Sequence, residues 1–271
     1  MERRKGMNIA IVTGASSGMG KECAEILADR FSGISEIWLI ARRKDRLEKL
    51  SDSLPVKTRL FSIDLGTEGA IHTLQAELKK TSPRVRFLVN AAGFGAIGKA
   101  GEISADLSAS MIRVNCESLT RITETVLPYM PVNSRILNFA SAAAFLPQPG
   151  FAVYAATKAY VLSYSRALRT ELKKRKIAVT AVCPGPVRTE FFDIAEKTGV
   201  IPVYKKLVMA DPGRVARTAV RDCMAGKSVS VYGITMKGFR LLCRVLPHEW
   251  LLKIWDIFPL KDADPSGPEA V

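Results

Sequence analysis

Short apolar runs alternate with longer stretches of helical spacing along most of this chain, and this alternation limits the folds open to it. Near-continuous apolar strands separated by helices are typical of a parallel sheet that is covered on both faces. We therefore expect an α/β fold, doubly wound, with a mainly parallel sheet. The predicted strands are residues 8–13, 36–41, 58–63, 85–90, 135–140, 178–183 and 228–232, and the predicted helices are 18–31, 44–53, 67–80, 104–127, 152–174 and 212–225.

No change of composition separates these units, so we expect a single domain over residues 1–271, with a core of about 8–232. The connection at about 186–212 is irregular and apolar in parts. Because connections longer than about 12–15 residues are usually functional or disordered, we interpret it as a substrate lid. Residues 233–260 are expected to form a C-terminal helical extension, and residues 261–271, which are acidic and rich in Pro and Gly, a tail.

The formal charge of +14 favours anionic partners, such as phosphate-bearing cofactors, acidic substrates, nucleic acid or anionic membranes. The basic residues are scattered and no recognition motif occurs, so we expect no nucleic-acid partner. The five cysteines are widely spaced without a Cys-x-x-Cys, and there are two histidines. We therefore expect neither a metal site nor a disulfide framework, and a cytoplasmic location fits best. No uncharged run approaches the roughly 20 residues of a membrane-spanning helix.

A glycine-rich turn, Thr13-Gly14-Ala15-Ser16-Ser17-Gly18-Met19-Gly20, follows the first predicted strand and opens the first helix. Gly14 permits the turn, Gly18 lets the backbone approach a pyrophosphate, and Gly20 allows close packing. The start of the helix offers amide donors and a positive dipole to phosphates. In this strand–turn–helix context the motif predicts a dinucleotide-binding Rossmann fold.

The end of the second predicted strand distinguishes between the two nicotinamide cofactors. A carboxylate there would hydrogen-bond the adenosine ribose and repel a 2′-phosphate. This chain has Ala41-Arg42-Arg43 instead, and two guanidiniums without an acid favour NADP(H), with NAD(H) as the alternative. The arginines could also be a solvated pair at the start of a helix. Asp64, after the third strand, is expected either to hold the adenine amino group or to cap the segment that follows.

Tyr154 and Lys158 are four residues apart in a predicted helix, so they share one of its faces. A positive charge nearby stabilises a phenolate and lowers the tyrosine pKa from its usual value of about 10. Such a tyrosine can pass a proton to or from a carbonyl or alcohol oxygen. Ser141, at the end of the preceding strand, could hydrogen-bond the same oxygen. Alone the pair is not specific, because Tyr-x-x-x-Lys also occurs on solvated helix faces.

Taken in order, these motifs resemble the classical short-chain dehydrogenase/reductase (SDR) family over about residues 8–232. Asn90-Ala91-Ala92-Gly93, Asn115 and Pro184-Gly185 also match the family pattern. One position departs from it, since some NADP-preferring members carry a basic residue where this chain has Ser17. The resemblance implies catalytic roles for Asn115, Ser141, Tyr154 and Lys158, and cofactor contacts from Gly14, Ser16, Ser17, Gly18, Met19, Arg42, Arg43, Asp64, Leu65, Asn90, Ala91, Tyr154, Lys158, Pro184, Gly185, Val187 and Thr189.

The implied activity is an NAD(P)(H)-dependent oxidoreductase, more narrowly NADP(H)-dependent, that interconverts an alcohol and a ketone or aldehyde by hydride transfer. Tyr154 would donate or accept the proton, and Asn115 would hold a water that relays protons through Lys158. Two alternatives stay open: a non-catalytic NADP(H)-sensing binding protein on the same fold, and a reductase of small polar carbonyls. The four matching catalytic positions argue against the first. The resemblance also implies a homo-oligomer.

Beyond residue 233 apolar and aromatic residues recur at helical spacing, with Lys237, Arg240 and Arg244 beside the first group. Three interpretations compete: helices that cover the core or a subunit interface, a wall of an apolar substrate pocket, and an interfacial membrane anchor with a basic rim. The last two suit a lipid, steroid or acyl substrate. We therefore expect a small-molecule carbonyl or alcohol substrate of apolar type, with peripheral membrane contact through this segment as an open alternative.

Overall fold

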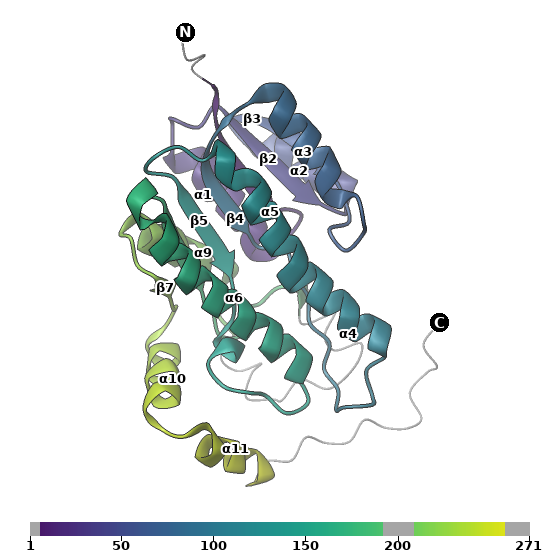
Figure 1. The fold of residues 1–271 in the computed structure, drawn as a ribbon, viewed down its shortest axis with the longest axis vertical. Helices are drawn as coiled ribbons and strands as arrows, with labels where there is room; N and C mark the ends of the chain where they lie inside the picture. Colours follow the sequence, from purple (N-terminus) through teal and green to yellow (C-terminus); the bar gives the residue numbers. More distant parts are fainter. Residues whose placement is uncertain (1–5, 192–208, 258–271) are drawn as a thin grey trace.

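The computed structural model describes residues 6–191 and 209–257 of the chain. In this part the strands, all paired in parallel, form one sheet in the order β3-β2-β1-β4-β5-β6-β7 (Figure 1). The order reverses between β1 and β4, and ligands of open α/β sheets bind at the carboxyl ends of the strands beside such a point. The strands are β1 (Asn8–Thr13), β2 (Glu36–Ala41), β3 (Lys57–Ser62), β4 (Arg84–Asn90), β5 (Arg135–Phe139), β6 (Ala178–Val182) and β7 (Val229–Ser230).

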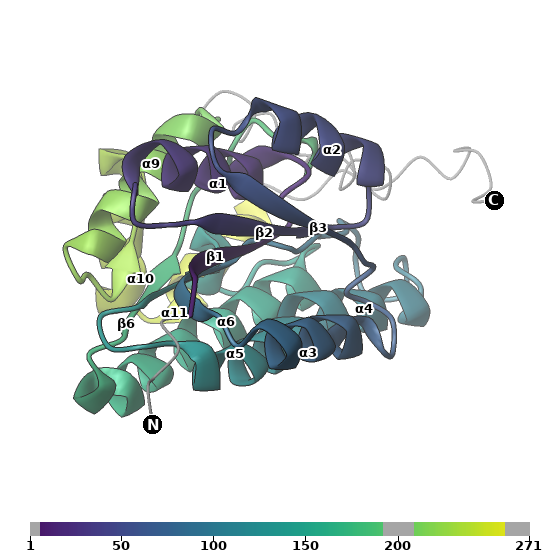
Figure 2. The same ribbon diagram turned by 90° about the horizontal axis from the view of Figure 1, so that it is seen from above.

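Helices cover both faces of the sheet, which confirms the doubly wound fold. Figure 2 shows α1, α2 and α9 on one face and α3, α4, α5 and α6 on the other. The predicted strands lie within a residue of those observed, except that β7 has two residues rather than the expected 228–232, because only these pair with β6. The helices on the two faces are α1 (Gly18–Arg30), α2 (Lys44–Ser53), α3 (Ala70–Thr81), α4 (Ala105–Ile112), α5 (Leu119–Val126), α6 (Ala152–Glu171) and α9 (Pro212–Met224).

The central strand β1 divides the core into two halves. Ala10 and Val12 pack with residues of α1, α2 and α9, whereas Ile9 and Ile11 pack with residues of α3, α5 and α6. All four are fully buried, and burial of each isoleucine side chain contributes about 1.5–3 kcal/mol to folding. This buried sheet fixes where each strand ends and thereby positions the loops that carry the candidate site.

The helix predicted at 104–127 is not continuous. A π-helical segment, Arg113–Ser118, separates α4 from α5, and Asn115 lies within it. α5 ends at Val126, one residue before the predicted end, and Pro128 lies in the short 3₁₀ turn that follows, Leu127–Tyr129, at a position where its missing N–H costs nothing. Apolar periodicity cannot reveal one extra residue in a helical turn, so the sequence pattern missed the π-helical segment. Such segments are frequent at functional sites.

The connection after β6 is described only at its two ends. The Arg188 N–H donates to the Ala210 carbonyl oxygen (2.9 Å), and the Ala210 N–H donates to the Pro186 carbonyl oxygen (2.9 Å). These bonds hold the two ends of the connection side by side. The predicted lid of 186–212 lies mostly outside the described residues, as do residues 258–260 of the predicted extension and the predicted tail of 261–271.

The expected C-terminal helical extension is present as α10 (Ile234–Val245) and α11 (His248–Ile257). Both helices lie beyond the carboxyl ends of the strands, on the β7 side of the sheet (Figure 1). Cys243 and Leu251 pack there against Leu146, which follows β5. Within the described residues, no helix is long and apolar enough to cross a membrane.

Candidate active site

A cavity of about 370 Å³ lies at the carboxyl ends of the strands. Its lining comes from the loops that follow each of the first six strands in sequence, so residues far apart in the chain meet there. The cavity brings together every predicted site residue except Asn90 and Asn115. It therefore joins the glycine-rich turn and the arginines after β2 to Ser141, Tyr154 and Lys158.

The glycine-rich turn is locked to the end of β4. Gly14 has a left-handed backbone (φ +66°), and a Cβ there would lie 2.8 Å from the Ala91 carbonyl carbon. The Thr13 hydroxyl accepts hydrogen bonds from the backbone N–H groups of Ala91 (3.1 Å) and Ala92 (3.2 Å). A Cβ on Gly20 would lie 2.3 Å from the Gly14 carbonyl oxygen, so the glycines permit a turn that no other residue allows.

Arg43 connects the end of β2 to this turn. One terminal nitrogen of its guanidinium donates to the hydroxyls of Ser16 (3.1 Å) and Ser17 (2.9 Å). Ser17, where some family members carry a basic residue, thus has a positive charge beside it, supplied by the N-cap residue of α2. Arg42 is exposed and also lines the cavity.

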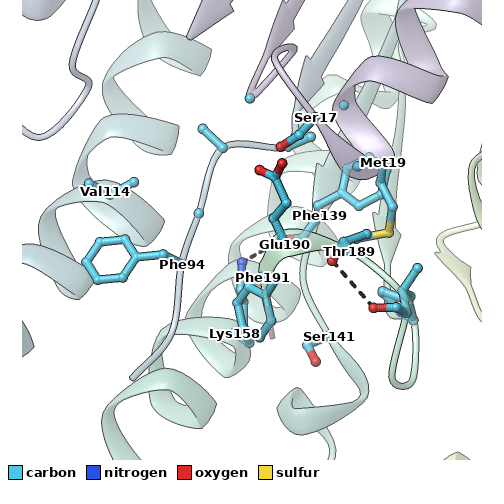
Figure 3. Close-up of a pocket in the computed structure, with 18 of the residues that line it drawn as sticks. Ser17, Met19, Phe94, Val114, Phe139, Ser141, Lys158, Thr189, Glu190 and Phe191 are labelled. Atoms are coloured by element: carbon cyan, nitrogen blue, oxygen red, sulfur yellow. Dashed lines mark hydrogen bonds between the residues drawn. The ribbon is translucent and has the colours of Figure 1, made fainter. Parts of the chain in front are cut away.

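Glu190 completes a group of charges that no sequence motif predicted. Its carboxylate accepts from Arg43 (2.7 Å) and from Arg46, which lies in the first turn of α2. These hydrogen bonds, from Arg46 first and Arg43 second, hold the pKa of Glu190 below its usual value. Figure 3 shows the Glu190 carboxylate directed toward Ser17. Glu190 and Arg46 were missed because 144 residues separate them and neither belongs to a recognised motif.

Asp64 and Leu65 both line the cavity, as predicted for residues that follow the third strand. The Asp64 carboxylate accepts a hydrogen bond from the Gly66 N–H (2.8 Å). Asp64 therefore stabilises the turn that follows it, which resembles the capping role expected as one alternative, and it also faces the cavity. The contact with an adenine amino group stays a prediction.

Asn90 lies behind the cavity rather than in its lining. Its side-chain amide donates to Thr123 on α5 (3.0 Å) and to Asn138 on β5 (2.9 Å). Asn138 in turn donates to Ser165 on α6 (3.0 Å). This buried network ties the sheet to two helices, so Asn90 stabilises the fold, and its contact with the cofactor stays a prediction.

Ser141 and Tyr154 meet at one end of the cavity. Ser141 follows β5, and its hydroxyl accepts from the Ala143 N–H (3.1 Å), which caps the short 3₁₀ helix Ala142–Ala144. Burial raises the pKa of Tyr154 to about 12, and a hydrogen bond with Ser141 opposes this increase. The phenol is therefore protonated at neutral pH.

Lys158 lies one helical turn after Tyr154, with its ammonium 5.5 Å from the centroid of the tyrosine ring. The ammonium donates to the Phe139 carbonyl oxygen (3.0 Å), as the dashed line in Figure 3 shows. Burial lowers the pKa of Lys158 to about 8. The net pKa of Tyr154 is thus raised, because removal of the phenol from water is the largest effect. The expected lowering of this pKa by Lys158 stays a prediction.

Asn115 is fully buried next to the cavity without lining it. Its side chain accepts from the Phe94 N–H (3.0 Å) and donates to the Phe94 carbonyl oxygen (2.9 Å) and the Thr157 hydroxyl (3.0 Å). A Cβ on Gly93 would lie 2.8 Å from the Asn115 side-chain oxygen and 3.2 Å from the Lys158 ammonium. Asn115 thus joins the loop after β4 to α6, and its role in a proton relay stays a prediction.

Aromatic side chains surround Tyr154 on the remaining side. Phe151 stacks on its ring at 4.3 Å and Phe191 lies tilted at 5.2 Å, measured between ring centroids. A Cβ on Gly95 would lie 2.9 Å from atoms of all three rings, so this glycine leaves the space they need. Phe94 also lines the cavity. Phe191 lies in the predicted substrate lid, whereas Phe94 and Phe151 were not predicted, because apolar side chains near a motif look like ordinary core.

The loop after β6 covers the same end of the cavity. The Pro184 carbonyl oxygen accepts from the Ala142 N–H (2.8 Å), which ties this loop to the one that carries Ser141. A Cβ on Gly185 would lie 2.6 Å from the sulfur of Met236, so α10 packs directly behind it. Thr189 lies against the glycine-rich turn, 3.1 Å from where a Cβ on Gly18 would be.

Comparison with known proteins gives a consistent result. A family model described as short chain dehydrogenase matches residues 8–198. The chain is 35% identical over 191 residues to sulfoacetaldehyde reductase 2 of Chromohalobacter salexigens, covering 68% of this chain and 74% of that protein. It is 34% identical over 194 residues to NADP-dependent 3-hydroxy acid dehydrogenase YdfG of Salmonella typhimurium, covering 70% of this chain and 77% of that protein. It is 32% identical over 224 residues to the very-long-chain 3-oxoacyl-CoA reductase of Bos taurus, covering 77% of this chain and 70% of that protein.

Solved structures resemble this one over nearly the whole chain. A short-chain dehydrogenase from Sphingobium yanoikuyae in complex with NADPH aligns with a TM-score of 0.74 at 25% identity, covering 97% of this chain and 100% of that one. The closed form of a serine dehydrogenase complexed with NADP⁺ aligns with a TM-score of 0.71 at 28% identity, covering 84% and 95%.

Proposed function

This chain belongs to the short-chain dehydrogenase family and is an NAD(P)-dependent oxidoreductase of CH–OH groups. We propose that it is an NADP(H)-dependent carbonyl reductase in which Tyr154 is the proton donor. One observation carries the proposal. A single cavity runs from the glycine-rich turn and Arg43 to Ser141 and Tyr154. A nucleotide held at the first end would thus place its reactive ring at the second.

The residues at the first end suit a phosphorylated dinucleotide. Gly18 has a left-handed backbone (φ +53°) at the start of α1, and a Cβ there would lie 3.1 Å from Thr189, so glycine permits both the turn and the close approach of Thr189. The N–H groups and dipole at the start of α1 favour phosphate oxygens. Arg42 and Arg43 add charge that suits a 2′-phosphate. NAD(H) stays the alternative.

The chemistry assigned to the protein is proton transfer and orientation, while the bound nicotinamide supplies the hydride. In reduction the Ser141 hydroxyl orients the substrate carbonyl oxygen by a hydrogen bond, and the Tyr154 hydroxyl donates its proton to that oxygen. Tyr154 is left as a phenolate, and the Lys158 ammonium, 5.5 Å from the ring centroid, stabilises its charge. Because the phenol is protonated at neutral pH, the resting site is prepared for reduction.

The aromatic wall around Tyr154 supports an apolar substrate. Phe94, Phe151 and Phe191 line this end of the cavity, and apolar walls with a few convergent polar groups are typical of sites for small organic ligands. We infer a ketone or aldehyde with an apolar body, such as a lipid, steroid or acyl chain. A reductase of small polar carbonyls is the alternative, and relatives of both kinds, the sulfoacetaldehyde and very-long-chain 3-oxoacyl-CoA reductases, are similar in sequence.

A second proposal concerns the outer face of α10. Ile234, Leu241 and Val245 are 87%, 62% and 69% exposed and lie at spacings of seven and four residues, so they form one stripe along the helix. Lys237, Arg240 and Arg244 are exposed along one side of this stripe. An apolar stripe with a basic rim suits the surface of an anionic membrane. A symmetric contact between two copies would instead bring like charges together.

The expected homo-oligomer would use a different surface. Ile112 on α4 and Tyr160 on α6 are 51% and 43% exposed, and both lie on helices through which the family resemblance implies subunit contacts. Aromatic side chains such as that of Tyr160 are enriched in interfaces. Analytical ultracentrifugation of the full chain, with Ile112→Ser as the variant, tests this proposal, and a monomeric wild-type protein would contradict it.

The reaction is tested by following NADPH absorbance with a panel of steroid, fatty-acyl and small polar carbonyls. The proposal predicts turnover with at least one carbonyl and higher kcat/KM for the apolar members. Preference for the small polar carbonyls would favour the alternative substrate class. NADPH binding without turnover of any carbonyl would favour the non-catalytic cofactor-sensing protein.

A further inference from the structure

Glu190 lies among the arginines that the proposed function assigns to the cofactor phosphate. It follows Thr189 in the loop after β6, whereas Arg43 and Arg46 stand at the start of α2. Each Glu190 carboxylate oxygen accepts from a different guanidinium, one from Arg43 (2.7 Å) and the other from Arg46. Two loops that are distant in sequence thus meet in one ion-pair group at the edge of the cavity.

The geometry of Arg43 makes this group relevant to cofactor selection. Its guanidinium uses one terminal nitrogen for Ser16 and Ser17 of the glycine-rich turn and the other for Glu190. A terminal nitrogen that could donate to a phosphate oxygen is therefore already bound to a carboxylate. Arg46 is engaged in the same way, through the other oxygen of Glu190.

The charge of Glu190 is maintained across the neutral pH range. Hydrogen bonds from Arg46 and Arg43 keep its pKa below the usual carboxylate value. The side chains of Glu190, Arg43 and Arg46 are each 38–39% exposed, so solvent reaches this group of charges. Water and salt therefore weaken the attraction between the carboxylate and the two guanidiniums. A carboxylate held this way can be displaced by a stronger anion.

A 2′-phosphate is such an anion, because it carries more charge than a carboxylate and guanidiniums bind phosphate oxygens in paired geometry. It would compete with Glu190 for the N–H groups of Arg43 and Arg46 that the carboxylate now holds, and the negative charges of the phosphate and the carboxylate repel each other. A cofactor without the 2′-phosphate has no need of these donors. Glu190 therefore opposes the phosphorylated cofactor selectively.

We propose that Glu190 is a specificity-determining residue: it occupies the anion site formed by Arg43 and Arg46 and limits the preference of this protein for the 2′-phosphorylated cofactor. This inference rests on the proposed use of NADP(H). Arg46 becomes a third basic residue of the phosphate site, and Glu190 sets how much of the positive charge there is available.

The test measures binding of two adenosine fragments to the full chain by calorimetry, 2′,5′-ADP and 5′-AMP, which differ only in the 2′-phosphate. Glu190→Gln keeps the size of the side chain and removes its charge. We expect this variant to tighten 2′,5′-ADP by about fivefold to tenfold, a range typical of one like-charge contact at a partly exposed site. Binding of 5′-AMP should change by less than about twofold, and high salt should reduce the difference.

Glu48→Gln is the matched control. Glu48 lies on the same helix as Arg46, is 53% exposed and pairs with Lys44, so its removal changes net charge equally without freeing Arg43 or Arg46. We expect it to leave both fragments unchanged. Arg46→Gln should weaken 2′,5′-ADP while 5′-AMP is retained. Melting curves of all variants establish that each is folded.

The outcomes separate this inference from the proposed function. If the wild-type chain prefers 2′,5′-ADP and Glu190→Gln leaves that preference unchanged or weakens it, the inference is overturned and NADP(H) use stands. An equal gain in Glu48→Gln would also overturn it, because the effect would then come from net charge. If neither the wild-type chain nor Glu190→Gln prefers 2′,5′-ADP over 5′-AMP, the proposed NADP(H) preference and the inference both fail.

Discussion

The ring of Phe151 stacks on the ring of Tyr154, with their centroids 4.3 Å apart and their planes inclined by 26°. Phe191 lies against the same tyrosine at 5.2 Å. These rings keep water from the phenol, and burial is the main reason that its pKa rises to about 12. The aromatic wall thus does two things, because it shapes the substrate end of the cavity and keeps Tyr154 protonated.

Gly95 makes this arrangement possible, so Gly95→Ala should disturb it. The new Cβ would lie 2.9 Å from atoms of Phe151, Phe191 and Tyr154, and the rings would have to move. We expect kcat to fall by about 10–100-fold, since a small misplacement of a catalytic group has effects of that order. Unfolding in urea should show a stability loss of about 1–3 kcal/mol. Gly33→Ala, where a Cβ meets nothing within 4 Å, is the control. Unchanged kcat in Gly95→Ala would refute the packing argument.

The buried ammonium of Lys158 should destabilise the folded protein at neutral pH. Its pKa in the folded chain, about 8, lies below the usual 10.5, so between these values the unfolded chain binds more protons. Its contribution to stability therefore rises with pH between about 8 and 10.5, and below pH 8 the buried charge is unfavourable. We expect Lys158→Met to lose activity yet to increase the free energy of unfolding at pH 7 by on the order of 1–2 kcal/mol, with a smaller gain at pH 10.

Urea unfolding at both pH values checks this prediction. Lys80→Met, at a side chain that is 77% exposed, should show no such pH dependence. A Lys158→Met protein that is less stable than wild type at pH 7, or whose difference from wild type is the same at pH 10, would contradict the assignment of a buried, destabilising charge.

Arg43 should matter more for NADPH than Arg42. Both line the cavity, but only Arg43 has described hydrogen bonds to Ser16 and Ser17, which hold its guanidinium beside the glycine-rich turn. We expect Arg42→Asp and Arg43→Asp to weaken NADPH far more than NADH, by about tenfold or more, because a carboxylate repels the 2′-phosphate. The larger loss should occur at Arg43. Dissociation constants from fluorescence titration measure this, with Arg166→Asp, exposed on α6, as the control. Equal losses for both cofactors would remove the argument for phosphate recognition.

The sequence alone predicted those features that depend on residues close to one another in the chain. Alternating apolar runs predicted the sheet, since a buried parallel strand must be apolar along its length. Gly14 and Gly20 were recognisable because the turn requires them, and Tyr154 and Lys158 because helical spacing puts both on one face. Each of these inferences depends on residues that are near one another in the chain.

The features that the sequence did not reveal arise from tertiary contacts. Glu190 meets Arg46 only after the loop following β6 folds onto α2. Asn90 matches the family motif, yet its amide turns to Thr123 and Asn138 and away from the cavity. The pKa of Tyr154 depends on how completely neighbouring rings exclude water, and no spacing rule expresses that.

The α10 stripe should bind anionic vesicles. We expect the full chain to float with vesicles that contain phosphatidylglycerol and to stay unbound with pure phosphatidylcholine, since the basic rim needs negative charge. The double variant Leu241→Ser/Val245→Ser should lose binding at all salt concentrations, whereas Arg240→Gln/Arg244→Gln should lose the salt-dependent part. Val132→Ser, an exposed apolar side chain elsewhere on the surface (55% exposed), is the control. Equal flotation with both lipids, or none, would rule out the proposed surface.

Tyr154→Phe tests the central claim most directly, because it removes one oxygen and keeps the ring that packs with Phe151. The measurement is NADPH oxidation with the best carbonyl of the panel, together with the NADPH dissociation constant, and Tyr129→Phe, outside the cavity lining, is the control. The account predicts a loss of turnover of at least about 100-fold in Tyr154→Phe, with NADPH binding retained and the control unaffected. Turnover near that of the wild-type chain would contradict the assignment of Tyr154 as the proton donor.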